Sequence, residues 1–304
     1  HISDVVLGSA GSVGAVGYYE FTGVTADDTI NASFEADVLV GLLVDGALDY
    51  SHSSDYLRAN GATQDWYESR GDLPTILYLD ETDVGGNTGR KAGFTEDTVD
   101  NAYLTQEFST VQTGNFSAQW DIYVDSIEDV SPWHAALMLI GDDSTPGQGP
   151  SAYNDERFVY MAFLHDGDTP DGEMELVARD NDDGWTSFTT IATGLNQQQW
   201  YTIKVICDLD ADAYDVYVNG TYQATVAARN AKTSLTHISF SQWDDSAGAF
   251  YIDNVEAEEI VTEYTISASA GTGGVIAPDG AVVVADGGNQ NFTITPDSGY
   301  HISD

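Results

Sequence analysis

Apolar and polar residues alternate along almost every segment of this chain that is not rich in Gly, Asn, Asp or Pro. A period of two residues places successive side chains on opposite faces of a β-strand, and the intervening clusters mark turns. No segment shows the period of a convincing amphipathic helix. The alternation is clearest over residues 116–124, 173–179, 201–208, 214–218 and 249–255. The sequence therefore predicts an all-β, antiparallel fold, with a hairpin turn at Asn219-Gly220.

Acidic residues far outnumber basic ones. The 304 residues include 50 Asp and Glu but 9 Lys and Arg, which gives a formal net charge of −41. Such a surface repels the phosphates of nucleic acids and the heads of anionic lipids, so we expect neither as a partner, whereas cations are favoured. Acidity also has a plainer explanation, because charge keeps an exposed protein hydrated and soluble.

Several features favour an exported protein. No stretch approaches the roughly 18–20 apolar residues of a membrane-spanning helix, so no membrane span is expected in this segment. The chain begins without Met and without a leader, and we expect it to be a piece of a longer polypeptide. Its single cysteine, Cys207, falls at an apolar position of a strand pattern, where it should be buried and inert. Export without disulfides suits a prokaryotic cell surface, so an extracellular, cell-surface location is predicted. Potential N-glycosylation sites are Asn31, Asn115, Asn219 and Asn291.

The two ends of the chain share a tetrapeptide. His-Ile-Ser-Asp stands at residues 1–4 and again at residues 301–304, which implies a repeat period of 300 residues. Every Lys and Arg lies between Arg58 and Lys232, so the ends are also alike in composition. We therefore expect identical copies to be joined head to tail, either in one covalent tandem array or as a non-covalent filament.

Joining the tail to the head produces a family resemblance that neither end has alone. The joined segment resembles the divergent internalin-type B-repeat, a small β-rich bacterial repeat domain found in tandem on secreted and surface proteins. The resemblance implies that residues 1–40 are the second half of one B-repeat-like domain and that residues 261–304 are the first half of the next. The motifs that carry it are Tyr264-Thr-Ile, Gly271-Thr-Gly-Gly-Val-Ile, Phe292-Thr-Ile-Thr-Pro, Gly299-Tyr-His-Ile, Tyr19-Glu-Phe-Thr and Thr29-Ile-Asn-Ala-Ser-Phe.

Residues 41–260 carry a second resemblance over most of their length. This region is similar to the concanavalin A-like jelly rolls of laminin-G-type and polysaccharide-lyase-associated modules. The resemblance implies an antiparallel jelly-roll sandwich of two sheets, with loops at its edges. Its ordered motifs are Ala102-Tyr-Leu-Thr-Gln-Glu-Phe-Ser, Trp120-Asp-Ile-Tyr-Val, Gly141-Asp-Asp, Arg157-Phe-Val-Tyr-Met-Ala-Phe, Trp200-Tyr-Thr-Ile-Lys-Val, Tyr214-Asp-Val-Tyr-Val-Asn-Gly, His237-Ile-Ser-Phe and Phe250-Tyr-Ile-Asp-Asn-Val.

Catalytic signatures are missing from the sequence. A retaining glycosidase on this scaffold would need two carboxylates about 5 Å apart, usually within Glu-x-Asp-x-x-Glu. Glu173-Met-Glu175 begins like that motif, but Ala178 and Arg179 follow, so both acids are interpreted as solvent-facing strand residues. The six His have no metal-ligand spacing, and there is no nucleophile elbow. We therefore expect no catalytic residues and no enzymatic activity.

Calcium is the one cofactor that the sequence suggests, as a structural ion. Asp80, Asp83 and Asn87 stand in a Gly-containing segment whose carboxylate, amide and carbonyl oxygens could surround a hard cation. The jelly-roll resemblance implies Asp253 as a further ligand from the last strand. Alternative acidic segments are 180–184 and 208–212. Asp, Asn and Gly are also frequent in turns, so each segment has a purely structural interpretation as well.

Glycan binding would use exposed aromatic rings that stack on a sugar. The candidates are Trp133, Tyr153 and Trp185, which stand in loop-like segments and could instead pack over the core. Strand residues Trp120, Trp200 and Trp243 are expected in the core.

Three functional hypotheses follow. The leading one is a non-catalytic structural repeat of an extracellular surface fibre, sheath or filament. The alternative is a carbohydrate-binding adhesin module, in which the repeats act as spacers that multiply avidity. The third is an accessory module of a secreted polysaccharide-active enzyme.

Overall fold

The computed structural model describes residues 2–7, 11–12, 30–34, 39–46, 48, 53–60, 65–69, 73–96, 100–127, 134–144, 148–151, 154–165, 173–179, 188–242, 248–260, 263–285 and 288–302. Its contacts divide the chain into two units. One unit is Val40–Glu259, and the other comprises His1–Leu39 together with Ile260–Asp304.

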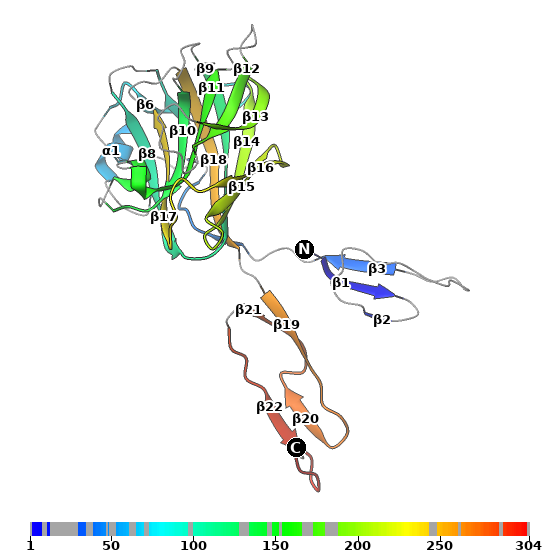
Figure 1. Ribbon diagram of the computed structural model, residues 1–304. Helices are drawn as coiled ribbons and strands as arrows, with labels where there is room; N and C mark the ends of the chain where they lie inside the picture. Colours follow the sequence, from blue (N-terminus) through cyan, green and yellow to red (C-terminus); the bar gives the residue numbers. More distant parts are fainter. Residues whose placement is uncertain are drawn as a thin grey trace, which may run out of the picture. The chain divides into compact units, whose positions relative to one another are not determined.

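The unit Val40–Glu259 is a sandwich of two antiparallel sheets (Figure 1), as predicted. The seven-stranded sheet has the order β13 (Thr189–Asn196), β12 (Glu173–Ala178), β11 (Arg157–His165), β10 (His134–Gly141), β17 (Leu235–Gln242), β8 (Ala102–Gln112) and β5 (Tyr67–Glu68). The eight-stranded sheet has the order β16 (Thr221–Ala227), β15 (Ala213–Val218), β14 (Trp200–Asp208), β9 (Phe116–Ile127), β18 (Gly248–Ile260), β7 (Lys91–Phe94) and β6 (Leu77–Asp80), with β4 (Leu39–Gly41) paired to β18.

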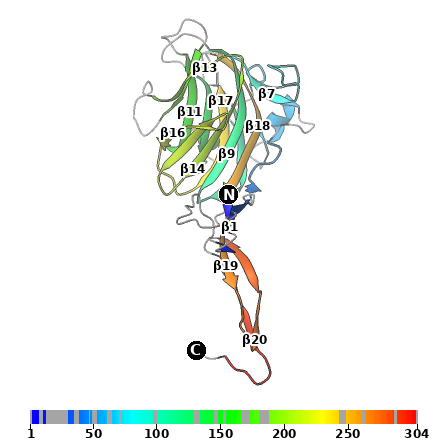
Figure 2. The ribbon, with the colours of Figure 1, turned by 90° about the vertical axis from the view of Figure 1, so that its right-hand side faces the viewer.

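The core lies between the two sheets, whose strands run face to face in Figure 2. Strand alternation sends every second side chain into this layer. Trp120 of β9 meets Phe240 of β17 with ring centroids 5.5 Å apart, so an aromatic pair bridges the sheets. Within the eight-stranded sheet, Phe94 stacks on Phe250 at 4.4 Å. Cys207 is buried in the same layer, as expected from its strand position.

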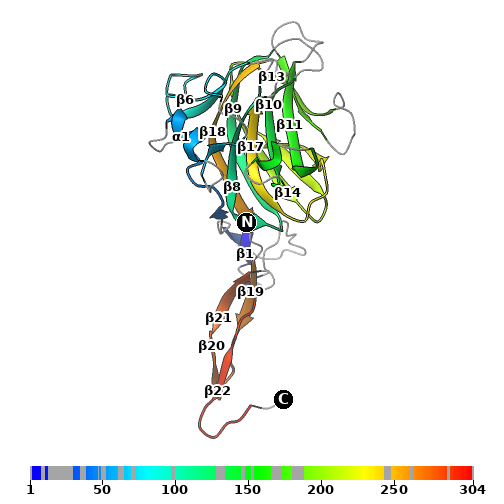
Figure 3. The ribbon, with the colours of Figure 1, turned by 90° about the vertical axis from the view of Figure 1, so that its left-hand side faces the viewer.

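The strongest sequence patterns all correspond to strands, but one short helix was not expected. Helix α1 (Ser54–Asn60) lies beside β6 (Figure 3), and two 3-10 turns cover Gly149–Ser151 and Asn154–Glu156. Seven residues make about two helical turns, too few for a period to emerge. Tertiary contacts hold the helix instead, because Leu57 is buried and the Arg58 guanidinium lies 3.3 Å from Glu68.

The other unit consists of small sheets. In the head, β1 (Ile2–Leu7) pairs with β2 (Gly11–Ser12) and with β3 (Ile30–Phe34), and the register places Ile2 opposite Phe34. In the tail, β19 (Glu263–Ala268) pairs with β21 (Gly280–Ala285), and β20 (Gly274–Ala277) pairs with β22 (Thr293–Pro296). Each tail sheet has two strands, and an isolated two-stranded ribbon is marginally stable in water.

Candidate functional site

Three strands of the seven-stranded sheet bring acidic side chains and a histidine together. The register places His237 of β17 opposite Gly141 at the end of β10 and opposite Glu107 of β8. Residues directly opposite each other in an antiparallel pair project to the same face, so His237 and Glu107 share one side of the sheet. Asp142 and Asp143 follow β10 at the same end. This arrangement depends on strand pairing over more than a hundred residues of sequence.

These residues surround a cavity of about 290 Å³. We call it the acidic pocket, and it is lined by Glu107, Asp142, Asp143, Ser144, Thr236 and His237. Carboxylates accept hydrogen bonds and do not donate them when ionised. The lining therefore suits a ligand that carries hydroxyl or amino donors.

Hydrogen bonds to the protein fix both aspartates of the pocket. Asp143 Oδ1 accepts a bond of 3.1 Å from the backbone N of Gly149, where a 3-10 turn begins. Asp142 Oδ2 pairs with Lys232 Nζ at 2.8 Å. Its backbone N donates to the carbonyl of Glu156 at 3.0 Å, which ties the segment to the second 3-10 turn. The two carboxylates are thus held in place before any ligand arrives.

His237 is the titratable ring of the pocket. Its Nδ1 lies 2.7 Å from Thr236 Oγ1, and its Nε2 lies 4.0 Å from Asp143 Oδ2. Burial lowers the pKa of His237, although the charges of Asp143, Glu107 and Asp142 act in the opposite direction. A histidine whose pKa lies below 6.5 is neutral at pH 7, so the ring carries one donor nitrogen and one acceptor nitrogen.

A buried tyrosine adds a hydroxyl next to the acidic pocket. Tyr67 of β5 is 1% exposed, and its hydroxyl has no hydrogen-bond partner among the residues that the structure describes. Burial raises the pKa of Tyr67, and the charges of Asp143 and Glu107 raise it further. The phenol is therefore a neutral donor close to two carboxylates. An unpaired buried donor costs free energy, but Tyr67 does not itself line the acidic pocket.

The sequence did not single out this site. Asp142 and Asp143 belong to the Gly141-Asp-Asp motif, and His237 opens another motif of the jelly-roll resemblance, but these motifs indicate the fold and predict no binding site. The residues of the pocket therefore stand in motifs that the sequence shows. The sequence does not show that β17 pairs with β8 and β10, which brings these residues together.

The residues predicted to bind calcium are only partly brought together. Asn87 Nδ2 donates to Asp253 Oδ2 at 2.6 Å, so the early segment and the last strand do meet. Asp80 instead accepts from the backbone N and the hydroxyl of Thr82, and Asp83 accepts from the backbone N of Gly86 at 2.9 Å. Within the described part of the chain, no group of three or more His, Cys, Asp or Glu has the geometry to hold a metal ion.

The other predicted site residues stay predictions. Trp133, Tyr153 and Trp185, the proposed sugar-stacking residues, lie outside the described residues, as does Trp243. Among the potential glycosylation sites, Asn115, Asn219 and Asn291 are exposed. Asn31 lies in β3, and only its backbone is described. Of the acids in the glycosidase-like segment, Glu175 accepts a bond of 3.3 Å from Thr190 and lies outside the acidic pocket.

Comparison with known proteins supports the architecture alone. No protein-family model and no curated protein sequence matches the chain. Among solved structures, the chain is similar to a sialidase, with 12% identity, a TM-score of 0.43 and coverage of 63% of this chain. The chain spans only 16% of that sialidase. It is also similar to a marine PL7 alginate lyase from Zobellia galactanivorans, with 13% identity, a TM-score of 0.42 and coverage of 60% and 81% of the two chains.

A further similarity covers nearly the whole of the matched protein. A conserved carbohydrate esterase from the Shiga toxin-encoding bacteriophage phi24B matches with 11% identity and a TM-score of 0.50, over 72% of this chain and 98% of the esterase. The chain is a jelly-roll β-sandwich. At this identity the similarity shows the fold and assigns no residue a role. The comparisons offer no support for the B-repeat resemblance of the ends or for the predicted calcium, filament and cell-surface location.

The expectation that the chain is not an enzyme was wrong. The β-sandwich shares its fold with a carbohydrate esterase. The jelly roll therefore gives no reason to exclude catalysis. As for the membrane, no helix within the described residues is long and apolar enough to cross it.

Proposed function

We propose that the β-sandwich binds carbohydrate in the acidic pocket. The observation that supports this proposal is the convergence of Glu107, Asp143 and neutral His237 on one cavity. Sugars present many hydroxyl groups, which can donate to carboxylates and accept from the N–H group of an imidazole. The volume of about 290 Å³ is close to the lower limit of about 300 Å³ for small-molecule sites, which suits one or two sugar units.

Charge limits the kind of sugar. Glu107, Asp142 and Asp143 line the pocket, and the whole chain carries a formal charge of −41. Of these three carboxylates, Asp142 is paired with Lys232 at 2.8 Å. An anionic sugar would be repelled from this pocket, whereas a neutral sugar or an amino sugar would not. We therefore expect neutral or cationic glycans to bind in preference to uronates, sulfated sugars or sialosides.

Glycan binding is tested with the full chain on an array that holds neutral, amino and acidic glycans. Asp143→Asn and Glu107→Gln should each weaken binding about tenfold or more, because each removes a charged acceptor. Glu173→Gln, on β12 and outside the pocket, is the matched control and should bind like the unmodified protein. Binding confined to acidic glycans, or binding that survives Asp143→Asn, would overturn the proposal.

The same experiment should record turnover. His237 is neutral and 4.0 Å from Asp143, so it could accept a proton from a bound hydroxyl or water. Released reducing ends or acyl groups should be measured for each glycan that binds. Loss of product with His237→Gln, at unchanged affinity, would assign the site a catalytic role.

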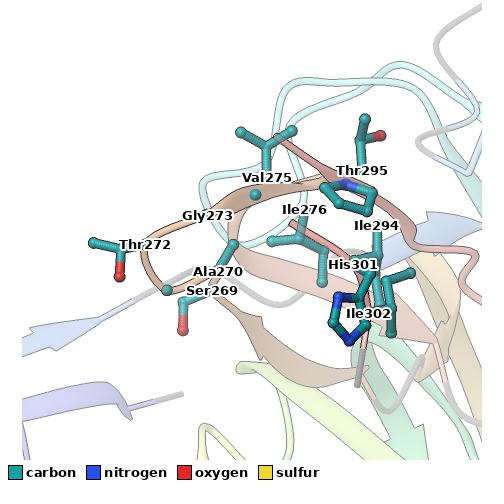
Figure 4. Close-up of a pocket in the computed structure, with 13 residues that line it drawn as sticks. Ser269, Ala270, Thr272, Gly273, Val275, Ile276, Ile294, Thr295, His301 and Ile302 are labelled. Atoms are coloured by element: carbon teal, nitrogen blue, oxygen red, sulfur yellow. The ribbon is translucent and has the colours of Figure 1, made fainter. Parts of the chain in front are cut away.

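A second function has its own support, namely assembly of identical copies from tail to head at a cell surface. The tail sheets expose large apolar side chains, and exposed apolar clusters mark interaction surfaces. Seven such residues are Tyr264, Ile266, Val275, Val283, Ile294, Tyr300 and Ile302. Figure 4 shows His301 and Ile302 beside a cavity of about 280 Å³ that Ile276 and Ile294 also line.

The shared tetrapeptide favours a second copy as the partner of this surface. In the head, residues 2–4 of His-Ile-Ser-Asp open strand β1, which pairs with β3. In the tail, the same tetrapeptide follows Tyr300, and its Ile302 is 61% exposed. Two-stranded ribbons leave strand edges that can pair with another chain. The head of a neighbouring copy would supply further strands and cover the exposed apolar side chains of the tail sheets.

Sedimentation velocity over a range of protein concentrations tests this assembly. The chain should form open-ended oligomers, and added salt should strengthen them because both ends are acidic. Tyr264→Ser should weaken association, whereas Tyr222→Ser, at a sandwich residue of similar exposure, should not. A chain that stays monomeric at every concentration and salt level would contradict the second function.

A further inference from the structure

Lys91, the first residue of β7, is completely buried, and its ammonium is enclosed by backbone carbonyls. Lys91 Nζ donates to the carbonyl of Thr82 at 2.6 Å, to that of Gly89 at 2.9 Å and to that of Asn87 at 3.3 Å. All three acceptors belong to residues 82–89, the segment that carries two of the predicted calcium ligands. We call residues 80–91 the cation loop.

The number of acceptors matches the number of donors. A lysine ammonium has three N–H groups and no acceptor, and a neutral amine would have only two N–H groups. Three carbonyl acceptors therefore require the charged form. No described carboxylate forms an ion pair with Lys91, and the ammonium is bound by carbonyl dipoles. A buried charge is tolerated only when it is satisfied in this way.

The side-chain oxygens predicted to bind calcium are engaged elsewhere. Asn87 Oδ1 accepts from the backbone N of Gly89 at 2.8 Å, while its amide nitrogen donates to Asp253. Because the Asn87 amide directs its nitrogen toward Asp253, it offers calcium no oxygen ligand on that side. Asp80 and Asp83 accept bonds from their own turns. The donor set thus lacks the convergent oxygens that calcium requires.

Hydrogen bonds within the chain close the cation loop and hold it to the sandwich. Val84 and Asn87 exchange backbone hydrogen bonds of 3.0 and 2.9 Å around Gly85 and Gly86, whose φ values are +56° and +90°. Trp200 Nε1 donates to the carbonyl of Val84 at 2.8 Å. The loop is therefore held against β14 by an indole and closed by a glycine turn.

We infer that the Lys91 ammonium is the built-in cation of this loop and stands in place of calcium. Backbone carbonyls are ligands that calcium accepts, but here an ammonium already occupies them. A divalent ion among the same carbonyls would be repelled by the adjacent ammonium of Lys91. The carboxylates of Asp80 and Asp83, which could offset this repulsion, are hydrogen-bonded within their own turns. The cation loop is thus independent of metal, and its stability depends on Lys91.

Substitution of the lysine tests the inference. Lys91→Met keeps an unbranched side chain one atom shorter than lysine and removes the charge, leaving the carbonyls of Thr82 and Gly89 without the ammonium donor. Each buried unsatisfied group is costly, so the Tm should fall by roughly 5–10 °C in this variant. Lys204→Met, at a partly buried lysine of β14, is the control and should change the Tm by no more than about 2 °C. Equal Tm values for the two variants would overturn the inference.

Calcium dependence gives a second measurement that needs no destabilised variant. The Tm of the unmodified protein should be the same in EDTA and in calcium. If calcium binds at another place, it should shift the Tm of Asn87→Ala and of the unmodified protein equally. A saturable rise in Tm with calcium that Asn87→Ala abolishes would place the ion in the cation loop and overturn the inference.

Chemical rescue adds a positive result. Lys91→Ala should gain stability in ammonium or alkylammonium chloride compared with sodium chloride at equal ionic strength, because a small ammonium can occupy the vacated carbonyls. The unmodified protein, whose loop is filled, should show no such difference. Rescue by calcium but not by ammonium would contradict the inference, since it would identify the loop as a site for a divalent ion.

Discussion

Asn87 Nδ2 donates a hydrogen bond of 2.6 Å to Asp253 Oδ2, across 166 residues of sequence. This contact ties the cation loop to β18, the last strand of the sandwich. Asp253 is 5% exposed, so its carboxylate depends on protein donors for most of its hydrogen bonds.

Removal of this amide should destabilise the sandwich. Asn87→Ala should lower the free energy of unfolding by about 1.5–3 kcal/mol, because a buried carboxylate loses a donor. Asn87→Asp should cost more, since it places a second carboxylate beside Asp253. Urea denaturation followed by tryptophan fluorescence measures both, with exposed Asn291→Ala as the control. A loss in Asn87→Ala no larger than in that control would contradict the role of the contact.

Stability should decrease as the pH falls below about 6.5 because of His237. Burial lowers the pKa of His237 in the folded state, so below about pH 6.5 this residue binds more protons in the unfolded chain than in the folded chain. The slope from this residue reaches at most about 1.4 kcal/mol per pH unit. Denaturation of His237→Gln between pH 4 and pH 8 should show a shallower decline than the unmodified protein. If the two proteins lose stability equally as the pH falls, His237 is not the source of the pH dependence.

The two glycines of the cation loop should respond differently to substitution. A Cβ at Gly85 would lie 2.5 Å from Cε2 of Tyr123, whereas a Cβ at Gly86 would meet nothing within 4 Å. Both residues have positive φ, so alanine brings about 1–2 kcal/mol of backbone strain at either place. Gly85→Ala should therefore lose more stability than Gly86→Ala in thermal unfolding. The reverse order would show that the ring of Tyr123 moves aside without cost.

Cys207 should not react in the folded protein. It is fully buried, and burial raises the pKa of its thiol, so little thiolate forms and reagents do not reach it. A disulfide reagent should label the chain at the rate of unfolding, and labelling should accelerate with urea. Rapid labelling in buffer would indicate that the eight-stranded sheet opens locally at β14.

Local patterns of the sequence determined the strands. Alternation at residues 116–124 and 201–208 predicted β9 and β14, and Asn219-Gly220 predicted a turn in which both residues have positive φ, of 49° and 75°. These features depend on side chains two residues apart or on the backbone of a dipeptide. They can be read without knowing which strands meet.

Long-range strand pairing decided which residues form the acidic pocket. Glu107, Asp143 and His237 form one pocket only because β17 lies between β8 and β10, and no local pattern specifies that order. Period-two alternation assigns a residue to a face of its strand. Which strands share that face is decided by packing of the whole core, because burial of apolar surface is non-directional and selects among pairings only collectively.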